Sequence, residues 1–205
     1  MPDDVLLQRD LSECDKRNNS LATKVPAIYF ALARGINVGG RKLIAMSDLR
    51  DLLAALGFTD VRSLLQSGNF VFRCDERSGA KLERLLEAET QKRLGVGVDY
   101  IVRTPAEWET AIARNPFPDE AANDPSHLVV MFLKETAAAE KVAELQAAIK
   151  GPEKIRHDGK LLYLTYPAGI GDSKLTSALI ERRLGTRGTA RNWNTVLKLA
   201  AAVRK

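Results

Sequence analysis

The order of secondary-structure signals occurs twice along the chain, and this duplication constrains the fold more than any other feature of the sequence. Apolar periodicity and turn residues predict strand, helix, strand, tight turn, strand and helix from Ala27 to about Arg103, and again from His127 to about Leu184. This is the order of a ferredoxin-like split βαβ unit, an antiparallel sheet with helices on one face. We therefore expect an α+β protein of two ferredoxin-like halves with antiparallel sheets and an extra C-terminal helix. Such halves would bury their open faces against each other or against extra helices.

The segments outside the two repeats are predicted to be irregular. Residues 1–25 are polar and lack the apolar core of a secretory signal, so we interpret them as a disordered extension or as the result of a start codon placed too early. The stretch from Asn115 to Pro125 holds three prolines and few apolar residues, which is typical of a linker. The predicted divisions are an N-terminal extension (1–25), a first ferredoxin-like half (26–115), a linker (116–126), and a second half with a C-terminal helix (127–205).

Capping residues predict where several helices begin. Ser47 is expected to cap the first helix, and Thr104 to Glu107 form a capping box with proline at the first helical position. Asp172 is a natural cap for a helix from Lys174 to Leu184. Where the first half has its fourth strand, the second half has Thr195 to Val203, which is predicted to be helical.

The positive charge of the chain is concentrated near its C-terminus. The net charge is +5, and the segment from Lys174 to Lys205 carries eight bases against one acid. This end either faces an anionic partner or forms surface helices with solvated bases. Cys14 and Cys74 give no disulfide framework, and no apolar run approaches the roughly 20 residues of a membrane helix. We expect a cytoplasmic protein with no membrane contact.

Four ordered motifs resemble a known bacterial family. They are Ala33–Gly40 (ARGINVGG), Gln66–Asn69 (QSGN), Tyr166–Leu175 (YPAGIGDSKL) and Arg191–Thr195 (RNWNT). Together they identify the chain as similar to the domain of unknown function 1697. The resemblance covers nearly everything from Pro26 onward and implies a fold of two ferredoxin-like halves, but it implies no activity. One departure is Ala45, where the family pattern leads us to expect proline.

Two loops are the first candidates for ligand binding. In a split βαβ unit the first two strands run the same way, so the loop from Arg34 to Lys42 and the turn from Gln66 to Asn69 should be neighbours. Glycine-rich backbone presents N–H groups to anions, and the bases would neutralise them. The predicted ligand-binding residues are Arg34, Asn37, Gly39, Gly40, Arg41, Lys42, Gln66, Ser67, Gly68 and Asn69. The alternative is structural, with glycines providing turns and amides capping them.

The first of these loops is not a nucleoside-triphosphatase loop. Gly35 and Gly40 have the spacing of that motif, but Arg41 stands where it needs lysine and Lys42 where it needs a hydroxyl. We therefore assign it no cofactor.

Two further segments are candidate anion sites. Gly169, Gly171, Ser173 and Lys174 precede a predicted helix, whose N-terminus favours an anion, although Asp172 as a simple cap explains the same pattern. Arg191, Asn192 and Trp193 are candidates for phosphate contact and base stacking. In the alternative interpretation Trp193 anchors the last helix in the core and Asn194 caps that helix.

No arrangement of residues in the sequence specifies a reaction. His127 and His157 have no partner at metal-ligand spacing, no nucleophile elbow occurs, and no catalytic residue or metal ligand is assigned. Aromatic residues around Phe30 and Phe70 resemble RNA-recognition motifs but lack their basic-glycine start. We expect non-covalent binding of a phosphate-bearing or other anionic ligand, a nucleotide or nucleic acid, by a monomer or homodimer. The alternatives are an enzyme acting on a nucleotide or phosphorylated metabolite, and a homo-oligomeric interaction protein whose polar loops are structural.

Overall fold

The computed structural model describes residues 26–37 and 43–203. The predicted extension (1–25) and four predicted binding residues lie outside the described residues: Gly39, Gly40, Arg41 and Lys42. Among the described helices, none is both long enough and apolar enough to cross a membrane.

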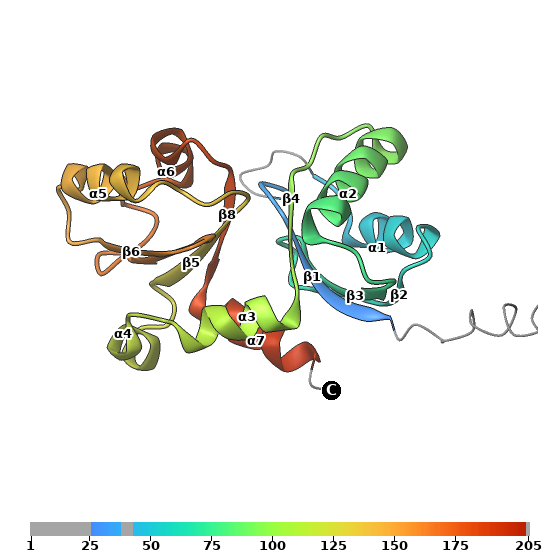
Figure 1. The fold of residues 1–205 in the computed structure, drawn as a ribbon, viewed down its shortest axis with the longest axis horizontal. Helices are drawn as coiled ribbons and strands as arrows, with labels where there is room; N and C mark the ends of the chain where they lie inside the picture. The colour runs from blue at the N-terminus through green and yellow to red at the C-terminus, as the bar shows by residue number, and fades with distance from the viewer. Residues whose placement is uncertain (1–25, 38–42, 204–205) are drawn as a thin grey trace, which may run out of the picture.

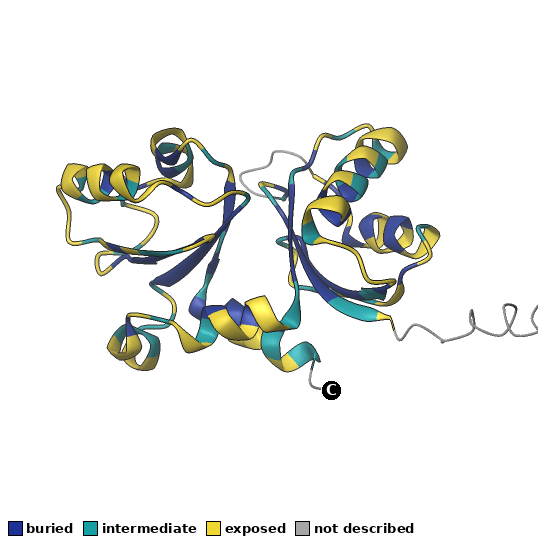
Figure 2. Ribbon diagram, in the orientation of Figure 1, coloured by how far each residue is buried: buried dark blue, intermediate teal, exposed yellow. Residues whose placement is uncertain are grey.

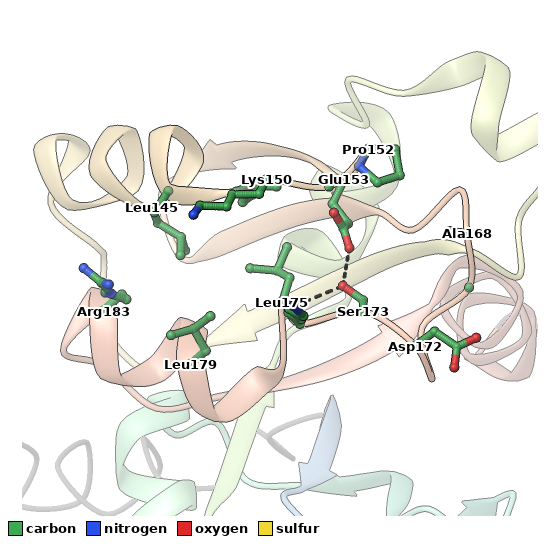
Figure 3. Close-up of a pocket in the computed structure, with 15 residues that line it drawn as sticks. Leu145, Lys150, Pro152, Glu153, Ala168, Asp172, Ser173, Leu175, Leu179 and Arg183 are labelled. Carbon is green, nitrogen blue, oxygen red and sulfur yellow. Dashed lines mark hydrogen bonds between the residues drawn. The ribbon is translucent and has the colours of Figure 1, made fainter.

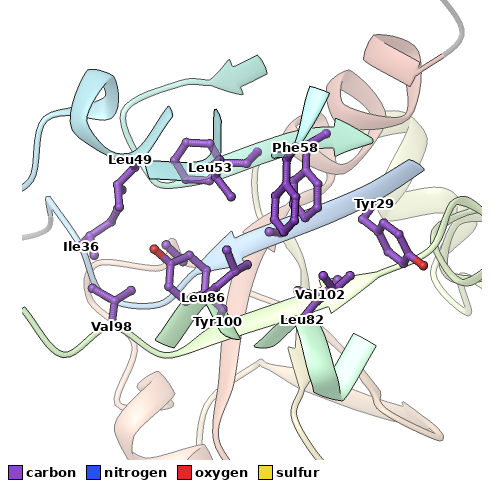
Figure 4. Packing of buried hydrophobic residues seen from close by; sticks show 14 of the residues in the cluster. Tyr29, Ile36, Leu49, Leu53, Phe58, Leu82, Leu86, Val98, Tyr100 and Val102 are labelled. Carbon is purple, nitrogen blue, oxygen red and sulfur yellow. The ribbon is translucent and has the colours of Figure 1, made fainter. Parts of the chain in front are cut away.

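The first half is a four-stranded antiparallel sheet in the order β2-β3-β1-β4. Its elements are β1 (Ala27–Ala33), α1 (Met46–Ala55), β2 (Thr59–Leu64), β3 (Asn69–Cys74), α2 (Gly79–Leu94) and β4 (Tyr100–Arg103). Both helices lie on the same face of the sheet (Figure 1). Leu49 and Leu53 of α1 and Leu82 and Leu86 of α2 are buried against this face, as their helical spacing predicts. Figure 4 shows this packing.

The second half repeats the plan, with the strand order β6-β7-β5-β8. Its elements are β5 (Leu128–Leu133), α5 (Ala139–Ala148), β6 (Lys154–Asp158), β7 (Leu161–Thr165), α6 (Ser177–Leu184) and β8 (Gly188–Asn192). All pairings are antiparallel, and α5 and α6 cover one face (Figure 1). The predicted α+β fold of two ferredoxin-like halves is therefore confirmed.

The fourth strand of the second half, β8, differs from the prediction. The sequence indicated only a helix at Thr195 to Val203, whereas β8 precedes a helix, α7, that spans Trp193–Val203. Where β8 begins, its backbone is packed closely against the neighbouring strand, β5. A Cβ on Gly188 would lie 2.7 Å from Met131 Cε and 3.0 Å from the Phe132 carbonyl oxygen. Position 188 therefore needs glycine, and the residues that follow, Thr189, Ala190 and Arg191, form no apolar run, so the usual strand signal is missing.

Helices α1 and α6 begin elsewhere than at their predicted caps. Helix α1 has Ala45 at its N-cap and no side-chain cap, and Ser47 lies inside the first turn. Met46, the first residue of this helix, is buried in the core. Tertiary packing at Met46 therefore outweighs the capping preference of Ser47. Helix α6 is capped by Thr176, whose Oγ1 accepts from the Leu179 N–H at 3.3 Å, and Asp172 lies outside the helix. The capping box predicted at Thr104 is confirmed.

A shared core lies between the two sheets. It is formed by the inner faces of both sheets together with α3 (Pro105–Ala113) and α7, while α4 (Pro118–Asn123) occupies the segment predicted as a linker. The Trp108 ring lies between Phe30 of β1 and Phe132 of β5, with centroid distances of 4.5 and 4.6 Å. Its Nε1 donates to the Val196 carbonyl of α7 at 3.1 Å. Figure 2 shows the buried strands of both sheets and the exposed outer faces of the surface helices.

Candidate ligand-binding site

The two polar loops of the first half do lie side by side. Asn37 Nδ2 donates to the Gln66 carbonyl at 3.1 Å, and the Ala33 N–H donates to the Gly68 carbonyl at 2.8 Å. Gly68 allows this approach, since its φ is +71° and a Cβ there would lie 2.7 Å from both Ala33 Cβ and Ile36 Cδ1. The described part of these loops is therefore closely packed.

The Asn37 and Asn69 side chains of these loops are hydrogen-bonded within the protein. The Asn37 side chain donates to the Ile44 carbonyl and accepts from the Ile44 N–H, both at 2.9 Å. Asn69 is fully buried and donates to the Leu64 carbonyl at 2.9 Å and to Ser67 Oγ at 3.0 Å. Gln66 is exposed. The amides here hold the turns together.

Arg34 connects the two halves by ion pairs. Its guanidinium donates twice to Glu181 of α6, with the Nε bond at 2.6 Å, and it also pairs with Asp99 at 3.4 Å. The hydrogen bond with Glu181 raises the pKa of Arg34. Lys134 of the second half reciprocally pairs with Glu87 of α2. Arg34 is thus already neutralised by carboxylates.

Arg191 is buried at the contact between the halves, with all five N–H donors used. They reach Asn69 Oδ1 at 2.5 Å, Thr189 Oγ1 and the Ala190 carbonyl at 2.8 Å, the Ser67 carbonyl at 3.0 Å and the Ala33 carbonyl at 3.1 Å. Desolvation lowers its pKa to about 10. Arg191 therefore joins β8 to the Gln66–Asn69 turn, and its donors are bonded to protein oxygens.

Residues 192–194 also have structural contacts. Trp193 is 5% exposed and belongs to the core between the sheets. Asn192 caps α7, since its Oδ1 accepts from the Thr195 N–H at 3.0 Å and from Thr195 Oγ1 at 2.8 Å. The predicted cap, Asn194, lies one residue inside the helix, because the strand β8 runs directly to Asn192.

The described residues do form a cavity, which lies in the second half between α5 and α6 (Figure 3). Its volume is about 440 Å³, within the range of small-molecule sites. Helix α6 has 8 residues, whereas its counterpart in the first half, α2, has 16. The chain that replaces the missing turns, residues 166–176, forms one wall of the cavity and leaves the hollow open.

The cavity combines an apolar wall with a charged rim. Leu145, Leu175 and Leu179 line it, and Lys150, Lys174 and Arg183 carry the positive charges. These three bases are exposed and form no ion pair with any residue that the structure describes. In Figure 3 the nitrogen ends of Lys150 and Arg183 lie at one end of the cavity and Asp172 at the other.

A serine and a glutamate meet on the cavity wall. Ser173 Oγ donates to Glu153 Oε1 and accepts from the Leu175 N–H at 3.1 Å. The Tyr166 hydroxyl donates to the carbonyl of the same Leu175 at 3.0 Å. Burial, with a further contribution from the Glu153 charge, raises the pKa of Tyr166 to about 12. These contacts fix the wall next to the bases.

The cavity contains part of the predicted secondary anion site and residues that the sequence did not indicate. Gly169, Ser173 and Lys174 line it, and Gly171 is exposed outside the lining. Lys150, Glu153 and Arg183 were not predicted, because they come from separate segments. The one local signal was a Gly-Pro turn at Gly151, between a helix and a strand. Within the described ranges no three His, Cys, Asp or Glu side chains are grouped so as to hold a metal ion.

The fold and the cavity together define the class: an α+β protein of two ferredoxin-like halves with a small-molecule-sized cavity in the second half. The chain belongs to the family described as Protein of unknown function (DUF1697), whose model matches residues 27–163. The structure resembles that of conserved bacterial protein SP0830 from Streptococcus pneumoniae, with a TM-score of 0.67 and 22% sequence identity. That match covers 88% of this chain and 99% of the other, and at this identity it supports the fold alone. A comparison with curated proteins finds no match.

Proposed function

We propose that the protein binds a small ligand non-covalently in the cavity between α5 and α6, and that this ligand carries a phosphate or similar anion on an apolar body. The observation that carries the proposal is the set of Lys150, Lys174 and Arg183, three bases that have no ion-pair partner within residues 26–37 and 43–203 and that surround an apolar hollow of about 440 Å³. Elsewhere, Arg34, Lys134 and Arg187 contact carboxylates of the other half.

The two parts of the cavity favour two parts of a ligand. Covering the leucine wall with apolar ligand surface favours binding by about 25 cal/mol per Å² of surface buried. Each rim base adds a modest attraction, because an exposed ion pair contributes roughly 0.2–1 kcal/mol. An alkyl phosphate and a nucleoside monophosphate both provide this chemistry.

The proposal is tested by calorimetric titration with hexyl phosphate and adenosine monophosphate at low salt. The triple variant Lys150→Ala, Lys174→Ala, Arg183→Ala is expected to weaken binding about tenfold, the combined effect of three exposed pairs. The matched control is Lys81→Ala, Lys92→Ala, Lys198→Ala, which removes the same charge from exposed positions away from the cavity. Binding should also weaken as salt is added. If neither probe binds, or if both triple variants behave alike, the proposed function is wrong.

A further inference from the structure

Glu153 provides the cavity with a carboxylate that is only partly used. Its Oε1 accepts from Ser173 Oγ, while its Oε2 accepts no hydrogen bond from a residue that the structure describes. No base is paired with Glu153 among those residues. The same cavity therefore carries a negative group on its wall and positive groups on its rim.

The position of this carboxylate depends on Gly151. A Cβ added to Gly151 would lie 2.1 Å from Glu153 Oε2 and 3.0 Å from its carboxyl carbon. The Glu153 side chain thus folds back over the bare Cα of Gly151, and Ser173 holds it there. Any other residue at 151 would displace the carboxylate. Since the displaced atoms are the end of a flexible side chain, the fold itself would tolerate the change.

A half-buried carboxylate costs free energy unless it is paired or hydrogen-bonded. An approaching ligand removes more water from Glu153, so a ligand group that donates to Oε2 offsets that cost. An ammonium or hydroxyl group does so, whereas a methyl group or a second anion does not. Figure 3 shows Glu153 and Ser173 near the middle of the cavity, with the nitrogen ends of Lys150 and Arg183 toward one end.

We infer that Glu153, held in place by Ser173 and Gly151, selects ligands that carry a hydrogen-bond donor, an ammonium or a hydroxyl, apart from their anionic group. This inference rests on the proposed function, because the rim bases are taken to hold the anion. It narrows the ligand class from anions on an apolar body to amino- or hydroxy-substituted phosphates.

The test uses three phosphates of equal chain length: heptyl, 6-aminohexyl and 6-hydroxyhexyl phosphate. Calorimetry gives the Kd of each with the wild type, Glu153→Gln, Gly151→Ala and the control Glu144→Gln, which removes an exposed carboxylate of α5 outside the cavity lining. Corresponding probes with chains two and four carbons shorter test shorter distances between the phosphate and the terminal group. The ratio of the heptyl Kd to the aminohexyl Kd is expected to fall about fivefold in Glu153→Gln and in Gly151→Ala, as a charge-assisted contact is lost. The ratio should stay unchanged in Glu144→Gln.

The outcomes separate this inference from the proposed function. If all three probes bind but neither variant changes the ratio, the role of Glu153 is wrong while binding by the rim bases stands. If none of the probes binds at any length, both proposals are wrong. Gly151→Ala keeps the test valid if Glu153→Gln does not fold, and thermal melting of each variant verifies folding.

Discussion

Arg103 of β4 and Arg191 of β8 occupy matching positions in the two halves, but the two buried charges are stabilised in different ways. Arg103 lies opposite Phe30 and Arg191 opposite Val130, which are matching positions of β1 and β5. Arg103 has Glu83 at 3.6 Å and donates to the Leu133 carbonyl, whereas Arg191 forms no ion pair with a described residue and relies on neutral oxygens. Its five hydrogen bonds must therefore offset the whole cost of burying the charge.

Arg191→Met tests which of these two terms is larger. The substitution removes a buried cation but leaves the Ala33 and Ser67 carbonyls and Asn69 Oδ1 without their donor. An unsatisfied buried group costs about 1–3 kcal/mol, so we expect the free energy of unfolding to fall by about 3 kcal/mol. The measurement is urea unfolding, and the control Arg183→Met at an exposed site should change stability by less than about 0.5 kcal/mol. Equal stability of the two variants would show that burial of the cation cancels its hydrogen bonds.

At the scale of elements, the order of strands and helices was predictable because apolar periodicity directly reports which face is buried. Strand β8 was not, since it is built from glycine, threonine, alanine and a buried arginine rather than from apolar residues. The late start of α6 was missed because a serine and an aspartate at residues 172–173 imitate a cap. The cavity lies between the segment around Gly151 and residues 168–183. These segments are distant in the sequence, so no local sequence pattern predicts that they line one cavity.

Gly188 of β8 is the position where close packing is most directly testable. A Cβ there would meet Met131 Cε at 2.7 Å, Leu133 Cδ2 at 3.0 Å and the backbone oxygen of Phe132 at 3.0 Å. Because a backbone atom cannot move as easily as a side-chain end, we expect Gly188→Ala to destabilise the fold by about 1–3 kcal/mol in urea unfolding. Gly171→Ala is the matched control, since nothing lies within 4 Å of its Cβ. A Gly188→Ala variant as stable as this control would contradict the close approach.

For the whole molecule, the contacts between the halves are reciprocal. The Nη2 of Arg103 reaches the last carbonyl of β5 and the Nη2 of Arg191 reaches the last carbonyl of β1. Ion pairs run both ways too, from Arg34 to α6 and from Lys134 to α2. This is the pattern of a self-complementary dimer interface, here within one chain. Two halves joined in this way, over a shared core, should fold as one unit.

Tryptophan fluorescence provides a direct test, because the chain has two tryptophans and both lie in the core between the sheets. Their emission reports separation of the halves, whereas circular dichroism at 222 nm reports all the helices, including α1, α2, α5 and α6 on the outer faces. If the shared core couples the halves, the two urea transitions should coincide, as in a two-state system. A fluorescence change at lower urea than the loss of helix would show that the halves separate first.

In Trp108→Ala the stacking with Phe30 and Phe132 is lost, so we expect the free energy of unfolding, measured in urea, to fall by about 3–5 kcal/mol. The same substitution removes packing between the halves, so a splitting of the transition is expected in Trp108→Ala before it is seen in the wild type.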